Sequence, residues 1–596
     1  MENHQAMVEM TSRRDARLLM EVALGREPAD LVLRNARLVN VYSGEILEDS
    51  WVALKGEWIA AVGRGEKDLP PADESRDLGG RTVIPGLVES HTHLVWYFSM
   101  HQFLPHAMWG GTTTIITESL ETYPIMGREG VLAFLDSFRD QPVKLFATLP
   151  ANVSISRRAR GVPREVVREL LRRPEVLGMG ETYWQALLQD PAAVLPNLEE
   201  TLRAGKTLEG HSAGARGAKL CAYTACGMTS CHEPIDAQQV MERLRLGYHV
   251  MIREGSIRRD LAAISELSGS DIDTRRLILV TDGISPRDLL EKGYMQYLVQ
   301  KAVDTGWDPV TAVQMATVNP AEHFGLGAVL GGIAPGRQAD LAVIPDEHTI
   351  APETVISRGR VVVDDQRLLC DPRPHVYPEA CRRTIRLAGP LAAEDFEVPC
   401  SRPDRVRVRV MELITDLVTR EAHLDLPVKE GRVTVDLQED VVKVAAIDRT
   451  FTPGRRFTGF VKGFGLRRGA VACSAAWDSS DIIVVGADDG DMALAVNRIA
   501  EMGGGCVAAA GGRVAAEVPM PVFGIISTEP VEILASQLNA FNRAAARLGA
   551  RSSDPMLTLV TLTGAAIPYL RICEEGLVNL KDGRTLTLFV DMPDAS

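Results

Sequence analysis

The sequence lacks an excess of basic charge and lacks any long uninterrupted apolar run. Its 596 residues include 65 Lys and Arg against 79 Asp and Glu, a formal net charge of −14. Binding to nucleic acid or to anionic membranes requires clustered positive charge. The longest apolar stretch, around residues 557–570, is interrupted by Thr, Gly and Pro and is too short to span a bilayer. We therefore expect neither a nucleic-acid partner nor a membrane association.

The sequence also lacks the cysteine patterns of metal knuckles and of disulfide scaffolds. Its nine cysteines include no CxxC pair, and the five-residue spacing of Cys221, Cys226 and Cys231 fits neither pattern. The first 26 residues carry acidic and basic side chains throughout, without the apolar core of a signal peptide. These features predict reduced thiols and a cytoplasmic protein.

Short β-strands separated by turns are predicted on both sides of a central region. The first set follows a helix at residues 14–25 and comprises 31–35, 37–41, 51–55 and 58–62. The second set lies within 332–344 and 355–363. We expect the two sets to complete one small composite β-sandwich. Its first part would occupy residues 1–83 and its second part residues 329–385.

Strands and helices alternate in the intervening residues, 84–328. The predicted strands include 111–117, 143–149 and 176–181, and the predicted helices include 130–138 and 163–172. Such alternation over about 240 residues predicts an α/β fold, a parallel (β/α)8-type barrel, whose usual size is about 250 residues. Catalytic residues of these barrels lie at the C-terminal ends of the strands. Polar residues that end predicted strands are therefore the candidate site residues.

His91 and His93 follow a Pro85-Gly86 turn and end an apolar strand. Alternate residues of a strand point to the same side, so both imidazoles could hold one divalent cation such as Zn, Fe, Mn or Ni. Four further polar residues end later predicted strands or follow them directly: Glu181, His211, His232 and Asp282. Chance explains any one of these residues, but not the whole set in barrel order. The sequence therefore predicts a metal site at the barrel mouth.

These residues resemble the amidohydrolase superfamily and, more narrowly, the bacterial adenine deaminase family. The superfamily features also include Ile333–Gly336 and Ala339–Leu341. The narrower features include Glu209–Gly214, Met251–Ser256 and, in the C-terminal region, Gly463–Ala470. The resemblance covers nearly the whole chain, and it implies a C-terminal α+β domain at residues 386–596, including a helix at 530–548.

The resemblance implies a binuclear centre of divalent metals, manganese or iron, with zinc also compatible. Its ligands would be His91, His93, Glu181, His211, His232 and Asp282. Glu181 would bridge the two metals together with a hydroxide, and Asp282 would move a proton from the hydroxide to the leaving nitrogen. The simplest reaction is the conversion of adenine and water to hypoxanthine and ammonia. The resemblance also implies a homo-oligomer.

Three segments depart from the family pattern. Where the family has Glu-Ser-Ser-Met after the HxH pair, Val95 replaces the acid; Thr-Asp-Asp becomes Thr281–Gly283; and His-Asp-Ser-His-Asn becomes Trp477–Asp481. A pocket that hydrogen-bonds one base rejects molecules that lack the matching groups, so changed partners favour a changed substrate. One alternative is therefore a ring-opening cyclic amidohydrolase acting on an oxidised, xanthine-like purine. A third hypothesis is a non-catalytic binding paralogue; loss of a metal ligand would support it, and the sequence shows no such loss.

The candidate substrate-binding residues are Trp96, His101, Arg253, Glu254, Trp477, Asp478 and Ser479. Trp477 could stack on a flat heterocycle, although a core position is equally compatible with the sequence. His101, or the nearby His106, could replace the missing acid. Arg253 and Glu254 could instead form a structural ion pair. We expect the C-terminal domain to cover the barrel mouth.

Overall fold

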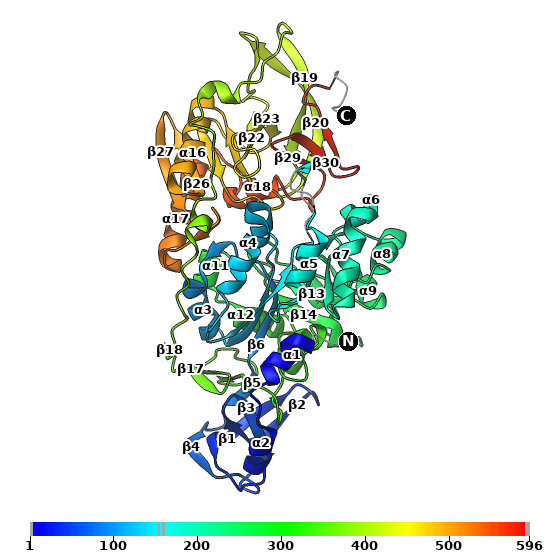
Figure 1. The fold of residues 1–596 in the computed structure, drawn as a ribbon, viewed down its shortest axis with the longest axis vertical. Coiled ribbons are helices and arrows are strands. Elements are labelled where there is room, and N and C mark those ends of the chain that lie inside the picture. Colours follow the sequence, from blue (N-terminus) through cyan, green and yellow to red (C-terminus); the bar gives the residue numbers. More distant parts are fainter. Residues whose placement is uncertain (1–3, 152–154, 158–160, 591–596) are drawn as a thin grey trace.

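The computed structural model describes residues 4–151, 155–157 and 161–590 (Figure 1). Its centre is an 8-stranded parallel sheet in the order β14-β13-β12-β11-β10-β9-β8-β6. These strands are β6 (Leu87–Thr92), β8 (Thr112–Thr117), β9 (Lys144–Leu149), β10 (Val176–Tyr183), β11 (Thr207–His211), β12 (Ser230–Cys231), β13 (His249–Arg253) and β14 (Leu277–Val280). The predicted (β/α)8-type barrel is confirmed.

The barrel closes between its first and last strands, β6 and β14. Thr92 and Asp282 form a parallel bridge, and the Asp282 N–H donates to the His91 carbonyl oxygen at 3.0 Å. The buried Glu89 carboxylate accepts from the His91 N–H and from the Thr281 N–H, each at 3.0 Å. The first and last predicted ligands along the chain, His91 and Asp282, are thus held together where the barrel closes.

The helices around the barrel begin and end largely where local signals predict. Asp236 accepts from the Gln239 N–H at the start of α9 (Ala237–Arg245), and Ser285 caps α11 (Pro286–Glu291). Helix α13 (Pro309–Met315) ends before Asn319 and Pro320, which both lie in α14 (Val318–His323). Pro320 is accommodated in the first turn of α14, where its missing N–H costs no helical hydrogen bond.

A 9-stranded sheet adjoins the barrel, in the order β18-β17-β16-β15-β5-β1-β2-β3, with β4 paired to β1. Its strands are β1 (Ala29–Asn40), β2 (Glu45–Lys55), β3 (Trp58–Arg64), β4 (Ala72–Asp77), β5 (Thr82–Pro85), β15 (Leu341–Ile344), β16 (Thr354–Ser357), β17 (Arg360–Asp364) and β18 (Arg367–Leu368). Strand β5 pairs with both β1 and β15, so segments before and after the barrel share one sheet. The two strands expected at 31–41 are one strand, kinked by register shifts around Ala36.

The C-terminal region lies at the opposite end of the barrel from this sheet (Figure 1). It contains a second 9-stranded sheet, whose edge strands are β21 (Arg432–Val433) and β27 (Arg513–Pro519), and the predicted helix, α17 (Val531–Leu548). A helix that the sequence analysis missed, α16 (Asp489–Met502), is capped by Asp488 and ends at Gly503 with φ 77°. Its buried face packs Met492, Val496 and Ile499 against the sheet.

Candidate active site

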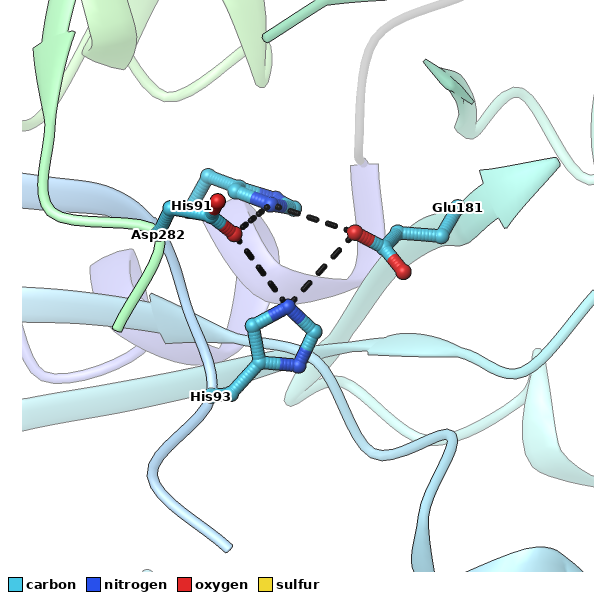
Figure 2. A group of neighbouring side chains, drawn as sticks. All are labelled: His91, His93, Glu181 and Asp282. Carbon is cyan, nitrogen blue, oxygen red and sulfur yellow. Dashed lines mark ion pairs between the residues drawn. The ribbon is translucent and has the colours of Figure 1, made fainter. Parts of the chain in front are cut away.

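The six predicted ligands converge at the C-terminal ends of the barrel strands. Two groups of side chains each place one donor atom per residue within 4.8 Å of one another. The first group is His91, His93, Glu181 and Asp282 (Figure 2), and the second is Glu181, His211 and His232. Glu181 belongs to both groups, so its carboxylate lies between two clusters of donors.

The donor atoms of the first group face a common centre. Glu181 Oε1 lies 3.6 Å from His91 Nε2 and 3.5 Å from His93 Nε2, and Asp282 Oδ1 lies 3.3 and 3.4 Å from the same nitrogens. Both Nε2 atoms and Asp282 Oδ1 are buried and have no hydrogen-bond partner. Buried polar atoms are normally satisfied. Imidazole nitrogens and carboxylate oxygens left in this way fit divalent cations.

Negative charge dominates this centre. Burial raises the pKa of Asp282, but the neighbouring His91 and His93 imidazoles outweigh burial and hold it well below its usual range. Burial likewise lowers the pKa of His91, yet the Asp282 and Glu181 carboxylates raise it to about 10. Carboxylates that raise the pKa of a buried imidazole in this way indicate that the site favours positive charge.

Three carboxylates that the sequence analysis did not select also reach the cluster. Glu233 Oε1 lies 3.2 Å from His211 Nε2 and 3.3 Å from His232 Nε2. Glu118 lies beside His91 and Glu121 beside His93. The strand-end rule could have found them, because Glu118 directly follows β8 and Glu233 directly follows His232.

A cavity of about 310 Å³ opens onto the cluster. Its lining includes Glu181, His211, His232 and Asp282 from the barrel. The C-terminal region contributes Leu417, Val418, Trp477, Asp478 and Ile567. The expected cover of the barrel mouth is therefore present, and a ligand in the cavity would touch both parts of the chain.

Asp478 connects the C-terminal region to the cluster. Its Oδ1 accepts from the Tyr183 hydroxyl at 3.0 Å, and its Oδ2 accepts from the Ala565 N–H at 2.6 Å. The same Tyr183 hydroxyl lies 3.4 Å from Glu181 Oε2. Burial raises the pKa of Asp478 to about 8. One tyrosine hydroxyl thus lies between the proposed bridging carboxylate and a wall of the cavity.

Trp477 and Arg253 also line the cavity. The Trp477 ring meets His93 edge-on at 5.6 Å and Trp96 at 5.5 Å between centroids. Trp96 borders a separate small cavity of about 40 Å³ next to the main one. Arg253 is held by three carboxylates, including Asp282 Oδ2 at 3.3 Å from its Nη1.

Three candidate substrate-binding residues point elsewhere in the described part of the chain. His101 Nδ1, on α3 (Met100–Trp109), lies 2.8 Å from the Pro372 carbonyl oxygen. Glu254 pairs with Lys301 at 2.6 Å, because neighbours on a strand face opposite sides and Arg253 takes the side facing the cavity. The Ser479 hydroxyl accepts from the Asp481 N–H at 3.2 Å.

The barrel and its strand-end cluster of histidines and carboxylates are those of an amidohydrolase. The family model described as "Amidohydrolase family" matches residues 82–362, and that described as "Adenine deaminase C-terminal domain" matches residues 416–584.

Proteins named adenine deaminase match the chain over nearly its full length. The sequence is 38% identical to that of Moorella thermoacetica over 575 residues, covering 94% of this chain and 96% of the relative. It is 35% identical to that of Cenarchaeum symbiosum, covering 94% and 93%, and 36% identical to that of Desulfatibacillum aliphaticivorans, covering 96% and 99%. The chain belongs to the adenine deaminase family.

Proposed function

We propose that this chain is a metal-dependent hydrolase that converts adenine and water to hypoxanthine and ammonia. The observation that carries the proposal is the cluster of six donor residues, four of which line a cavity of about 310 Å³. Pockets of this size accommodate small heterocycles rather than macromolecules. The near full-length similarity to proteins named adenine deaminase supports adenine as the substrate.

The proposed centre is binuclear. His91, His93 and Asp282 would hold one divalent cation, His211 and His232 the other, and Glu181 would bridge them. When bound, two such cations lower the pKa of a shared water and polarise the atom under attack. Manganese or iron is proposed from the family resemblance, and zinc is chemically compatible with the same donors.

Asp282 is the proposed proton carrier. Arg253 Nη1 donates to its Oδ2 at 3.3 Å, while its Oδ1 faces the centre without a hydrogen-bond partner. Its backbone has φ 63°, a conformation that Asp tolerates better than bulky residues do. This oxygen would be available to the attacking water and to the exocyclic nitrogen, so the same carboxylate could take a proton from one and give it to the other.

The base would lie against the C-terminal region. Trp477 offers an aromatic surface beside His93, and Asp478 offers a buried carboxyl group that Tyr183 and the Ala565 N–H hold in place. Stacking on Trp477 and hydrogen bonding to Asp478 would orient the ring with its amino group toward Asp282. Trp477 stands where the family pattern has its first histidine, and Asp478 keeps the Asp of that pattern.

The relatives do not favour a ring-opening amidohydrolase, and the presence of all six donors does not favour a non-catalytic paralogue. The test is a reconstitution of metal-free protein with manganese or iron, followed by assays of ammonia release from adenine and of ring absorbance with xanthine. We expect ammonia from adenine, and its loss in Asp282→Asn. Metal-dependent loss of xanthine absorbance, with no ammonia from adenine, would overturn the proposal.

We also propose a homo-oligomer, on the family resemblance, and a cytoplasmic location, on the free state of all nine cysteines. No helix in the described ranges has the length and apolar character of a membrane span.

The division into domains at residues 83/84, 328/329 and 385/386 is likewise proposed, although the first boundary falls within β5. Light scattering and limited proteolysis test the assembly and the boundaries.

A further inference from the structure

Two buried glutamates lie on the far side of the HxH pair from the cluster. Glu118 Oε1 is 3.6 Å from His91 Nδ1, and Glu121 Oε1 is 2.5 Å from His93 Nδ1. The Nε2 atom of each histidine faces Glu181 and Asp282 instead. Each imidazole therefore has a glutamate carboxylate beside its Nδ1 atom and the proposed metal centre beside its Nε2 atom.

The barrel places both glutamates there through one strand end. They follow β8, the neighbour of β6, and Glu121 immediately precedes α4 (Thr122–Asp136). The Thr117 hydroxyl donates to the Thr92 carbonyl oxygen at 2.9 Å and accepts from the Leu94 N–H at 3.0 Å. These bonds align the Glu-x-x-Glu segment with the HxH pair.

The space for Glu118 depends on a glycine. A Cβ atom at Gly180, the residue before Glu181, would lie 1.9 Å from Glu118 Oε2. The Oε2 atoms of Glu118 and of Glu121 are also buried without a hydrogen-bond partner. Burying carboxylate oxygens without partners is costly. Two such oxygens, one of them in a space that only glycine leaves open, indicate a role beyond packing.

Trp96 reaches the cluster through one of these glutamates. Its indole N–H donates to Glu121 Oε1 at 2.6 Å, the same oxygen that lies beside His93 Nδ1. Trp96 occupies a position where the family pattern has a small polar residue. Its contact with Glu121 gives this departure a function that requires no contact with the substrate.

We propose that Glu118 and Glu121 are positioning residues of the metal centre. Each keeps the proton of one histidine on Nδ1, so that the Nε2 lone pair faces the metal, and Trp96 holds Glu121 in place. Removal of such outer carboxylates typically weakens metal binding by 10–100-fold. The inference rests on the proposed metal centre but not on adenine as the substrate.

Manganese affinity, measured by chelator competition on the full chain, tests the proposal. We expect Glu121→Gln to weaken manganese binding by roughly 10–100-fold, and Glu118→Gln to weaken it less, because a 3.6 Å contact acts through charge more than through a hydrogen bond. Turnover at saturating manganese should recover in both variants. An affinity in Glu121→Gln equal to that of the wild type would overturn the proposal.

A matched control separates positioning from general stability. Glu209 and His323 form another buried pair, with Glu209 Oε2 2.9 Å from His323 Nε2, near the N-terminal ends of β12 and β13. Glu209→Gln should lower the metal-free melting temperature and leave manganese affinity unchanged. Equal affinity losses in this control and in Glu121→Gln would overturn the positioning role. A wild-type chain that binds no manganese would instead overturn the metal centre itself.

A double variant tests the role of Trp96. Trp96→Phe alone should weaken manganese binding, because Glu121 loses one of its two donors. Residues that act through one another are not additive. Trp96→Phe should therefore have no further effect in the Glu121→Gln background. If the losses of manganese affinity in the two single variants add in the double variant, Trp96 does not act through Glu121, and this part of the proposal is overturned.

Discussion

The Asp282 N–H donates to the His91 carbonyl oxygen at 3.0 Å, so the hydrogen bond that closes the barrel joins two proposed ligands of one metal. The same contact brings their side chains together, with Asp282 Oδ1 3.3 Å from His91 Nε2. The geometry of the site and the closure of the barrel should therefore be lost together.

Metal binding should stabilise the fold. A ligand that binds only the folded state adds about 2.7 kcal/mol at a free concentration 100 times its dissociation constant. Removal of metal should thus lower the melting temperature, and manganese should restore it in a concentration-dependent way. Differential scanning calorimetry checks this. Identical curves with and without metal would contradict it, and magnesium, which prefers oxygen ligands, serves as the control.

Asp282→Asn should abolish most turnover and leave the fold intact. The amide keeps the shape of the side chain but cannot carry a proton between water and the leaving nitrogen, and such transfers contribute roughly 10²–10⁴-fold. The value of kcat, measured on samples of equal metal content, checks this. A variant within tenfold of the wild type would assign the proton transfer to another group.

Trp477→Ala should raise the KM for adenine. Stacking of one base on an aromatic ring is worth roughly 1–3 kcal/mol by alanine substitution, and Trp477 lines the cavity beside His93. Trp477→Phe keeps a ring and should lose less. Steady-state kinetics separates KM from kcat. An unchanged KM in the alanine variant would place Trp477 in the core rather than against the base.

Asp478→Asn should become relatively more stable than the wild type as pH rises. Burial raises the pKa of Asp478 from 3.8 to about 8 in the folded chain, so folding favours its protonated form. The wild type therefore loses stability between about pH 4 and pH 8 because of Asp478. The asparagine variant does not titrate at this position, so it should not lose this contribution to stability. Melting temperatures of the two metal-free proteins across this range check the prediction. A constant difference would contradict it.

Gly180→Ala should disturb the proposed metal site through Glu118. The added methyl group would overlap Glu118 Oε2, and overpacking of this kind costs roughly 1–3 kcal/mol. We expect a lower melting temperature together with weaker manganese binding. Gly269→Ala is the control, since its added atom meets nothing within 4 Å. Wild-type affinity in Gly180→Ala would show that Glu118 moves away without consequence.

The barrel and the convergence of its six donors follow from the sequence because strand ends carry the signal. Each donor ends an apolar strand or follows one directly, and parallel strands bring their C-terminal ends together. Glu118 satisfies the same rule after β8, and Glu121 lies three residues further on. Nothing in the local sequence shows that either carboxylate lies beside the Nδ1 atom of a histidine.

The predictions of substrate-binding residues are limited because the sequence alone does not show which side chains face the cavity. Arg253 and Glu254 are adjacent in sequence, but strand alternation sends only Arg253 to the cavity. Trp477 and Asp478 lie far along the chain from the barrel, and their contacts with His93 and Tyr183 arise from tertiary packing alone. The missed helix α16 has buried apolar residues at helical spacing, Met492, Val496 and Ile499, so this element could have been predicted from the sequence.

The wall that Trp477 and Asp478 contribute comes from a part of the chain that supplies none of the six metal donors. Mutations in that wall can change which ring is accepted while the hydrolytic apparatus stays intact. If Trp477 and Asp478 contact the base as proposed, these two residues lie on a different stretch of sequence from the proposed metal ligands. A lineage could explore new substrates by altering the C-terminal part alone, and exchanging that part between relatives should transfer preference without rebuilding the catalyst.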